Sequence, residues 1–378
     1  MDYFTNDLPN YLRDLRELVE LETPTRDVEQ AGRAAAWLAE RFSPYADVET
    51  EMLTGFGPML KIHRPGTGTR VLLLAHYDTV WPVGSWSDPW QERDGRIFGP
   101  GIYDMKAGLL YILWLLQWLE ATGRPHPEIK ILFNPDEEVG SLQSLPAIQA
   151  AAKASEVVLV LEAATPNGEV KLERKGSGDF FLDIRGRSAH QGVEPENGIS
   201  AVVEAAHQIL RMLELQDLAA GTTVGPNVIR GGTAANAVAD RARISIDVRA
   251  WTTAEQRRLD QALRALTPVL EGASLELTGQ WNRLPMESTP ASVAIFERVR
   301  QIGADLGMDV GRAAWGGASD ANLTAAVGVP TVDGFGPMGR HAHQPSEHII
   351  VDQLPIRMAL FAEVVASFAE APVSGLKV

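Results

Sequence analysis

The residues of this sequence that can do chemistry follow three short apolar runs of the kind that form buried strands. The polar residues at the ends of these runs are His76 and Asp78, then Asp136, Glu137 and Glu138, and finally Glu162. Open α/β sheets bind ligands at the carboxyl ends of their strands, so we expect these side chains to share one sheet edge. Imidazole and carboxylate groups gathered at one edge can bind divalent metal ions.

Two further segments carry side chains of the same kinds. Asp104 follows Gly99–Gly101 at the start of a helical pattern, and three histidines lie close together near the C-terminus: His341, His343 and His348. Considered singly, each segment has an ordinary interpretation: a turn histidine, a helix cap, a solvated acidic turn or a polar loop. Together they supply two His, two Glu and one Asp. That set suits two zinc ions which share a bridging carboxylate and activate water between them.

The composition restricts the chemistry further. None of the 378 residues is cysteine, which excludes disulfides, thiol nucleophiles and cysteine zinc sites. A net charge of −15 argues against nucleic acid as a partner but leaves room for a local basic pocket. The longest apolar run, 109–119, is too short to span a membrane, and no signal-peptide pattern opens the chain. We therefore expect a cytoplasmic protein without a membrane partner, unless a leader has been removed.

The pattern of apolar residues predicts two domains. Continuous apolar runs predict parallel strands at 71–75, 129–134, 157–161 and 329–333, with helices at 105–121 and 142–154. This alternation indicates an α/β domain with right-handed crossovers. In the middle of the chain, 242–249 alternates as a half-exposed strand does, with helical patterns at 199–215 and from Thr253. We therefore predict a ferredoxin-like α+β domain at 176–285, inserted into a discontinuous domain at 1–175 and 286–378.

The sequence resembles the co-catalytic dizinc exopeptidases and deacylases, a family that includes acetylornithine deacetylase, succinyl-diaminopimelate desuccinylase, aminoacylase and glutamate carboxypeptidase. The similarity extends over nearly the whole chain and looks closest to the carboxypeptidase G branch. The motifs that carry it are His76-Tyr77-Asp78-Thr79-Val80, Gly99 to Gly108, Asp136 to Ser141, Gly186-Arg187-Ser188-Ala189-His190 and Ala342 to Glu347. The resemblance implies an α/β zinc-exopeptidase (phosphorylase/hydrolase-like) catalytic domain with an inserted ferredoxin-like dimerisation, or lid, domain.

The resemblance also implies roles for the candidate residues. His76 and Glu162 would bind one zinc ion, Glu138 and His343 the other, and Asp104 would bridge them. Cobalt or manganese could replace zinc, because this set of ligands tolerates several metals. Asp78 would orient His76, and Glu137 would be the general base. His343 is preferred to the other two histidines because the family pattern is His, three residues, Glu. The family further implies a cis peptide bond after Asp104.

The inserted domain would contribute the remaining residues and a homodimer contact. His190 would reach the active site of the partner subunit and stabilise the oxyanion, while Asn236 and Arg249 would bind the substrate carboxylate. Gly317 belongs to a glycine loop that resembles one lining the family's pocket. The glutamate-specific branch has an arginine directly before the proline that ends the lid domain. Here that position is Leu284 and the arginine is Arg283, so a preference for glutamate remains open.

The resemblance implies a zinc-dependent hydrolase that cleaves the amide bond between an acyl or peptidyl group and a C-terminal amino acid with a free carboxylate. The leading interpretation is a glutamate-carboxypeptidase-like enzyme, and the alternative is an N-acyl-amino-acid deacylase of the aminoacylase or acetylornithine-deacetylase type. A more remote alternative is a non-catalytic, metal-dependent binding protein.

Overall fold

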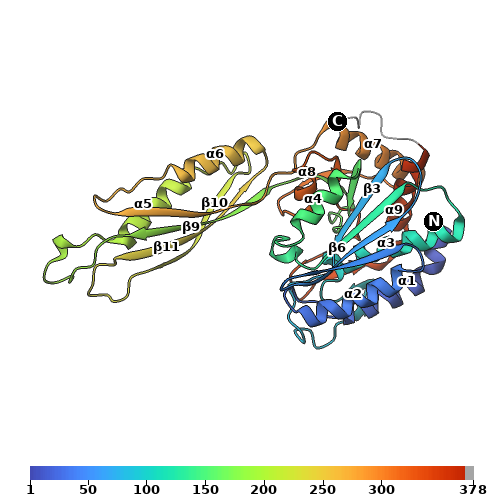
Figure 1. The fold of residues 1–378 in the computed structure, drawn as a ribbon, viewed down its shortest axis with the longest axis horizontal. Coiled ribbons are helices and arrows are strands. Elements are labelled where there is room, and N and C mark those ends of the chain that lie inside the picture. Colours follow the sequence, from blue (N-terminus) through green and yellow to red (C-terminus); the bar gives the residue numbers. More distant parts are fainter. Residues whose placement is uncertain (371–378) are drawn as a thin grey trace. The chain divides into compact units, whose positions relative to one another are not determined.

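The apolar runs form the centre of a six-stranded sheet in a computed structural model that describes residues 1–370. The strand order is β1-β2-β6-β3-β7-β14 (Figure 1). These strands are β1 (Asp47–Leu53), β2 (Gly57–Arg64), β3 (Arg70–His76), β6 (Glu128–Asn134), β7 (Val157–Val160) and β14 (Thr331–Val332). Strand β3 pairs in parallel with β6 and β7, whereas β1 and β2 add an antiparallel edge. The sheet is therefore mixed, with its four predicted strands in the parallel part.

Helices bury the apolar side chains of this sheet. The helices of this part of the chain are α1 (Asp2–Glu20), α2 (Val28–Phe42), α3 (Ala107–Thr122), α4 (Leu145–Lys153), α7 (Pro290–Asp305), α8 (Asp320–Ala325) and α9 (Leu354–Glu370). Helix α3 is apolar on nearly every side because it contacts α1, α9 and the sheet. Tyr11 of α1, for example, stacks on Trp114 of α3 with ring centroids 4.5 Å apart. Within residues 1–370, no helix combines the length and apolarity needed to cross a bilayer.

Short strands join loops that are distant in the sequence. One small sheet has the order β15-β16-β5-β4, and β8 pairs with β13 in a two-stranded ribbon. The strands are β4 (Gln91–Arg93), β5 (Arg96–Phe98), β8 (Val170–Arg174), β13 (Arg312–Trp315), β15 (Gly339–Arg340) and β16 (His348–Ile350). Because β16 pairs with β5, the segment before His348 lies beside the segment after Phe98. This pairing brings the C-terminal histidines to the Asp104 segment.

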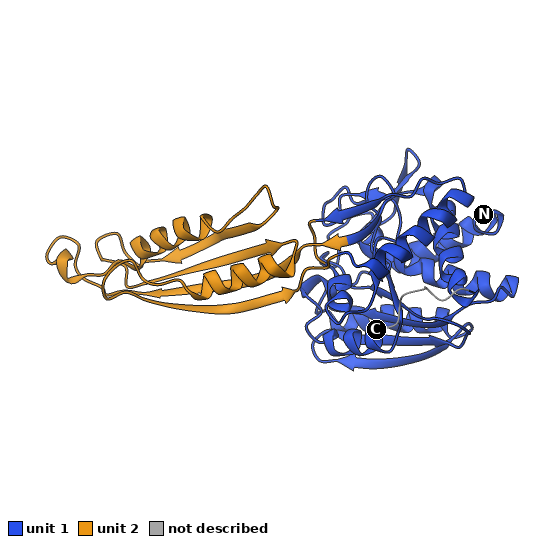
Figure 2. Ribbon diagram, turned by 90° about the horizontal axis from the view of Figure 1, so that it is seen from above, with its two compact units in different colours: residues 1–172, 288–315, 319–378 blue, residues 173–287, 316–318 orange. Residues whose placement is uncertain are grey.

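The chain divides into two compact units, coloured separately in Figure 2. Unit 1 comprises Met1–Leu172, Ser288–Trp315 and Ser319–Val378, and unit 2 comprises Glu173–Glu287 and Gly316–Ala318. The domain bounds predicted from the sequence, 175/176 and 285/286, stay predictions; the two compact units divide at 172/173 and 287/288. Arg174 exchanges backbone hydrogen bonds with Met286 and donates one from its guanidinium to Gly317 O, which explains why these segments belong together.

Unit 2 contains a four-stranded antiparallel sheet in the order β10-β11-β9-β12. Its elements are β9 (Gly176–Arg185), α5 (Ala201–Leu213), β10 (Thr223–Gly231), β11 (Arg241–Ala250), α6 (Thr253–Arg264) and β12 (Ser274–Arg283). Alternate residues such as Leu182 and Ile244 point into a core that α5 and α6 cover, and the intervening residues are more exposed. The cap of α6 is Thr252 rather than the expected Thr253, because the Thr252 hydroxyl accepts a hydrogen bond from Glu255 N.

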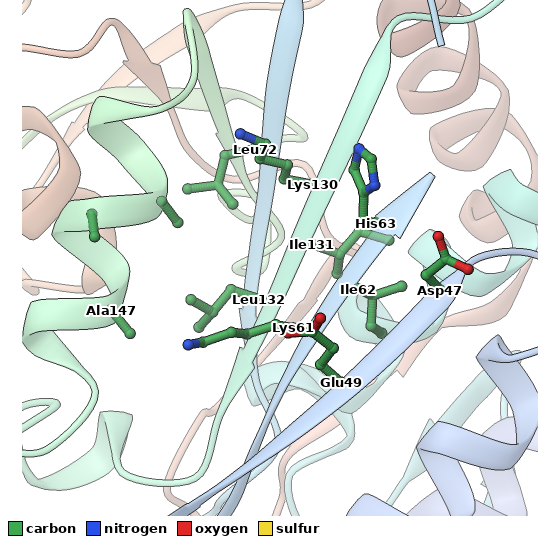
Figure 3. Close-up of a pocket in the computed structure, with 12 residues that line it drawn as sticks. Asp47, Glu49, Lys61, Ile62, His63, Leu72, Lys130, Ile131, Leu132 and Ala147 are labelled. Atoms are coloured by element: carbon green, nitrogen blue, oxygen red, sulfur yellow. The ribbon is translucent and has the colours of Figure 1, made fainter. Parts of the chain in front are cut away.

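A groove on unit 1 lies between α4 and strands β2 and β6 (Figure 3). Leu72 and Leu132 contribute apolar surface to it, and Lys61 and Lys130 line it. Lys61 Nζ lies 2.5 Å from Glu51, and Lys130 Nζ lies 3.9 Å from Glu128, so both ammonium groups have acidic neighbours. None of the candidate site residues lines this groove. The candidate site residues of unit 1 lie elsewhere, at or beyond the ends of β3, β6 and β7 and in the loops beside them.

Candidate metal centre

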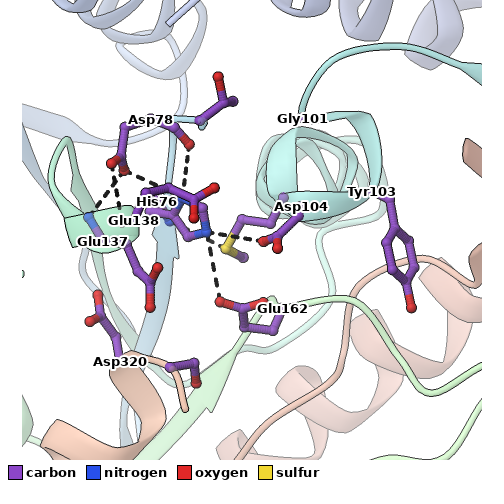
Figure 4. A network of polar contacts seen from close by, with 12 residues as sticks. His76, Asp78, Gly101, Tyr103, Asp104, Glu137, Glu138, Glu162 and Asp320 are labelled. Carbon is purple, nitrogen blue, oxygen red and sulfur yellow. Dashed lines mark hydrogen bonds and ion pairs between the residues drawn. The ribbon is translucent and has the colours of Figure 1, made fainter. Parts of the chain in front are cut away.

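His76, the last residue of β3, is buried with both ring nitrogens engaged. Its Nδ1 lies 3.0 Å from the backbone oxygen of Asp78 and 3.4 Å from the Asp78 carboxylate. Its Nε2 faces Asp104 Oδ1 at 3.3 Å and Glu162 Oε1 at 3.7 Å (Figure 4). Burial opposes a charge on the ring, but the carboxylates of Asp104 and Asp78 raise the pKa of His76 well above its usual value. One imidazole therefore faces two carboxylates across a small space.

Asp104 lies in a π-helical turn, Ile102–Lys106, whose irregular backbone includes a cis peptide bond between Asp104 and Met105. This confirms the cis bond that the family resemblance implied. The two carboxylate oxygens of Asp104 face different imidazoles: Oδ1 faces His76, and Oδ2 lies 3.3 Å from His343 Nε2. Although burial acts in the opposite direction, the two imidazoles hold the pKa of Asp104 well below its usual range.

Glu138 and His343 complete the second half of the cluster. Glu138 lies in the 3-10 turn Glu137–Val139 after β6, and its Oε2 is 3.1 Å from His343 Nε2. The other oxygen, Oε1, is buried without a hydrogen-bond partner. Hydrogen bonds that the His343 ring donates to the carboxylates of Asp104 and Glu138 raise its pKa to about 11. His341, by contrast, bonds to the Ser346 hydroxyl, and His348 Nδ1 lies 2.9 Å from Ser346 O.

The residues form two groups of potential metal ligands that share Asp104. In each group the ligand atoms all lie within 4.8 Å of one another; the groups are His76, Asp104 and Glu162, and Asp104, Glu138 and His343. Three carboxylates and two imidazoles lie close together in this space, and cations would neutralise the negative charge of the carboxylates. Buried charges must be paired or coordinate a metal, and the buried Glu138 Oε1 has no other partner. The donor set therefore fits two divalent ions of the kind that nitrogen and oxygen ligands bind.

Asp78 supports both halves of this cluster. Its Oδ1 accepts a hydrogen bond from Glu137 N and its Oδ2 accepts one from Glu138 N, both at 3.2 Å. The Thr25 hydroxyl also donates to Oδ2, at 2.7 Å. Asp78 therefore orients the acidic turn as well as His76, which the strand-end pattern alone did not reveal.

The three consecutive acids after β6 have three different environments. Asp136 is fully buried and accepts hydrogen bonds from Gln143 N and from the backbone and hydroxyl of Ser144. Glu138 turns toward His343, and Glu137 is partly exposed beside them. Asp320 accepts a hydrogen bond from the side chain of Asn134, the last residue of β6, at 2.9 Å. The three acids therefore differ in their contacts, and Glu137 is the one that lies directly between the buried Asp136 and the Glu138 that faces His343.

Glu347 is a residue of this site for which sequence reasoning proposed no role. Its buried carboxylate accepts hydrogen bonds from the backbone of the Asp104 turn and from the Trp81 indole. Burial, assisted by the Asp104 charge, raises the pKa of Glu347 to about 7. Its only sequence signal was the spacing of four residues from His343.

Unit 2 carries the residues that the resemblance assigns to substrate and oxyanion binding. His190 and Asn236 are both exposed and lie on adjacent segments, because His190 pairs with Ala237 and Gln191 N donates to Asn236 O. Arg249 binds the carboxylate of Asp247 through its Nε and Nη2, at 2.7–3.1 Å. Gly317 uses its carbonyl to accept the hydrogen bond from Arg174.

The placement of Arg283 depends on a bulge in β12. Arg249 of β11 and Arg283 of β12 both pair with Ser177 of the intervening strand β9, and the register of β12 shifts between Trp281 and Arg283. A bulge adds one residue to a strand and so changes which side chains share a face. Arg249 and Arg283 therefore lie in the same row of the sheet, on either side of Ser177.

Comparisons with known proteins agree with this geometry. The model of the family described as "Peptidase family M20/M25/M40" matches residues 72–367. The chain is 28% identical to carboxypeptidase G2 of Pseudomonas sp. (strain RS-16), covering 96% of this chain and 90% of that protein. It is 27% identical to succinyl-diaminopimelate desuccinylase of Acidovorax ebreus, covering 76% of this chain and 78% of that protein.

Solved structures show the same fold. Aminopeptidase PepT of Bacillus cereus has a TM-score of 0.80 at 23% identity, covering 96% of this chain and 99% of that chain. The M20 family metallo-carboxypeptidase Sso-CP2 of Sulfolobus solfataricus has a TM-score of 0.78 at 16% identity, with the same coverage. At these identities the likeness speaks for the fold alone.

Proposed function

The chain belongs to peptidase family M20/M25/M40, and from this premise we propose that it is a dizinc amidohydrolase that releases a C-terminal amino acid with a free carboxylate. The observation that carries the proposal is the pair of ligand groups that share Asp104. Five side chains, one from the end of β3 and four from segments outside the strands, face one another there. Such an arrangement is costly without cations to neutralise it.

The proposed ligands are His76, Asp104 and Glu162 for one ion and Asp104, Glu138 and His343 for the other. Metal ions held there would lower the pKa of water and polarise the scissile carbonyl. Glu137 is the proposed general base, which takes a proton from the attacking water and passes it to the leaving amine. The backbone N–H of Glu137 donates a hydrogen bond to Asp78, which fixes the turn that carries the Glu137 side chain beside the proposed ligands.

Substrate recognition is assigned to unit 2. We propose that Arg249 and Asn236 bind the carboxylate of the released amino acid, with Arg283 in the same row as Arg249. A guanidinium presents paired donors that match a carboxylate. The Arg249 guanidinium donates hydrogen bonds to the Asp247 carboxylate, which keep it oriented. The substrate carboxylate would replace Asp247 as its acceptor. Gly317 would line the pocket.

We also propose that the protein is a homodimer formed through unit 2. Helix α5 exposes four large apolar side chains, and the edge strand β10 exposes two more. These residues are Val202, Val203, Leu210, Leu213, Val228 and Ile229. An apolar stripe beside an open strand edge is the kind of surface that a second copy covers. His190 of one copy would then serve the oxyanion in the site of the other.

A second candidate is an N-acyl-amino-acid deacylase, because several succinyl-diaminopimelate desuccinylases are 24–27% identical to this chain. The two candidates share the metal chemistry and differ in which side of the amide is recognised. The site residues alone support both.

The test is a hydrolysis screen of the zinc-loaded protein, read by mass spectrometry. The panel contains peptidyl and N-acyl forms of glutamate, aspartate, leucine, phenylalanine and arginine, with the methyl esters as matched controls. We expect cleavage of free acids and not of esters. Cleavage of glutamate conjugates favours the carboxypeptidase, and cleavage of one acyl group regardless of the amino acid favours the deacylase. No cleavage by protein that holds two zinc ions would overturn the proposal and favour a binding protein.

A further inference from the structure

Glu347 ties together the segments from which the metal centre is built. Its side chain is fully buried, and four donors surround its carboxylate. Oε1 accepts hydrogen bonds from Tyr103 N at 3.0 Å and Asp104 N at 3.1 Å. Oε2 accepts them from Gly101 N at 3.2 Å and from the Trp81 indole at 2.9 Å. Charge-assisted bonds of this kind are stronger than those between neutral groups.

These four bonds connect segments that are distant in the sequence. The Gly101–Asp104 turn carries the shared carboxylate, and Glu347 belongs to the same loop as His343, four residues away. Trp81 belongs to the segment that leaves Asp78 after β3. The backbone adds another link, because Gly99 N donates to Glu347 O at 3.4 Å. Through these hydrogen bonds, the Glu347 carboxylate connects the Asp104 turn to the loop that carries His343.

We propose that Glu347 is a positioning residue that fixes Asp104 relative to His343 and so sets the affinity of the Asp104–Glu138–His343 group for its metal ion. This inference rests on the proposed metal centre. Side chains that orient metal ligands without touching the metal typically change metal affinity or activity about 10–100-fold when replaced. The first group shares Asp104 but takes no ligand from the loop that holds both His343 and Glu347, so we expect it to depend less on Glu347.

The role requires a carboxylate of this length. A glutamine retains one acceptor oxygen and presents an NH₂ group to N–H donors that need an acceptor. An aspartate is one methylene shorter and cannot reach both the Asp104 turn and the indole from the same backbone position. The exact charge and length of Glu347 therefore both matter, which a side chain that only fills space would not require.

The test compares Glu347→Gln with a matched control, Glu204→Gln. Glu204 is also a buried carboxylate, and it accepts hydrogen bonds from Val269 N, Leu270 N and the Gln208 amide, but it lies in α5 of unit 2. Metal-free protein is titrated with zinc in competition with a chromophoric chelator, which yields an affinity for each ion. Steady-state kinetics on a cleaved substrate then separate kcat from KM.

We expect Glu347→Gln to lower the affinity of the Asp104–Glu138–His343 group for its zinc ion about 10–100-fold. The affinity of the other group should fall less, and kcat should fall with little change in KM. Glu204→Gln should lose thermal stability and retain both affinities. If Glu347→Gln fails to fold, Trp81→Phe removes one donor and should weaken the second ion by a smaller factor. Wild-type affinities in folded Glu347→Gln would overturn the inference alone. A wild-type protein without two zinc ions would overturn the proposed function as well.

Discussion

Replacing Asp78 by asparagine should weaken the Glu138 half of the metal centre more than the His76 half. In the wild type, Oδ2 of Asp78 accepts hydrogen bonds from Glu138 N and the Thr25 hydroxyl. Asparagine keeps an acceptor toward Glu137 N but places an NH₂ group where Oδ2 was. His76 loses less, because its Nδ1 retains the backbone oxygen of residue 78 at 3.0 Å.

The size of the effect follows from these contacts. A hydrogen bond to a charged group contributes roughly 1.5–3 kcal/mol, and a buried donor left without an acceptor costs about 1–3 kcal/mol. Loss of a residue that supports a metal ligand reduces metal affinity about 10–100-fold, or about 1.4–2.8 kcal/mol at 1.4 kcal/mol per factor of ten. We expect Asp78→Asn to lower the zinc affinity of the Asp104–Glu138–His343 group by that factor. The affinity of the His76–Asp104–Glu162 group should fall less than tenfold.

The assay is the same chelator competition, together with thermal unfolding of the metal-free protein. Asp47→Asn is the control, since Asp47 is an exposed aspartate at the start of β1. Thr25→Val removes one donor and leaves the carboxylate, so it should produce a smaller loss. Equal weakening of both ions, or none, in a folded Asp78→Asn protein would refute the assignment of Asp78 to the acidic turn.

Three more predictions concern unit 2. Burial opposes ionisation of Glu204, but hydrogen bonds from Leu270 N, Gln208 and Val269 N lower its pKa below the unfolded value of 4.5. The ionised carboxylate therefore stabilises the fold fully above pH 4.5, and this contribution is lost as the pH falls through the folded pKa. Glu204→Gln should therefore cost about 1–3 kcal/mol at pH 7 and much less near pH 3 in urea unfolding, and an equal loss at both would contradict this. Leu210→Glu should weaken self-association at least tenfold in sedimentation, unlike the control Met52→Glu at an exposed site on β1; unchanged association would exclude α5 from the interface. Arg249→Ala should raise KM about tenfold or more with a smaller change in kcat, whereas equal KM values would remove Arg249 from substrate binding.

The sequence was most informative where a local pattern determined a local structure. Continuous apolar runs located β3, β6 and β7, and the parallel pairing of β3 with both neighbours places their carboxyl ends at one edge. His76 ends β3, Glu138 and Glu162 come after β6 and β7, and all three lie near Asp104 or share a ligand group with it. The family model confirms the resemblance that the motifs carried.

Features that depend on distant contacts could not be predicted in the same way. The role of Glu347 arises from backbone N–H groups far away in the chain, and any residue type can supply such groups. The bulge before Arg283 adds a residue without a distinctive sequence, so the pairing of Arg283 with Ser177 could not be predicted. The unit boundaries depend on Arg174 and Gly317, which are more than 140 residues apart but share a hydrogen bond. Periodicity contains no information about such contacts.

The central claim is that Glu137 moves the proton at a centre of two metal ions. The most direct test measures zinc content and turnover of Glu137→Gln on the best substrate from the screen. We expect Glu137→Gln to bind two zinc ions, as the wild type does, and to have a kcat lower by about 10²–10⁴-fold, the usual contribution of a positioned general base. Wild-type turnover by Glu137→Gln with both ions bound would contradict the account.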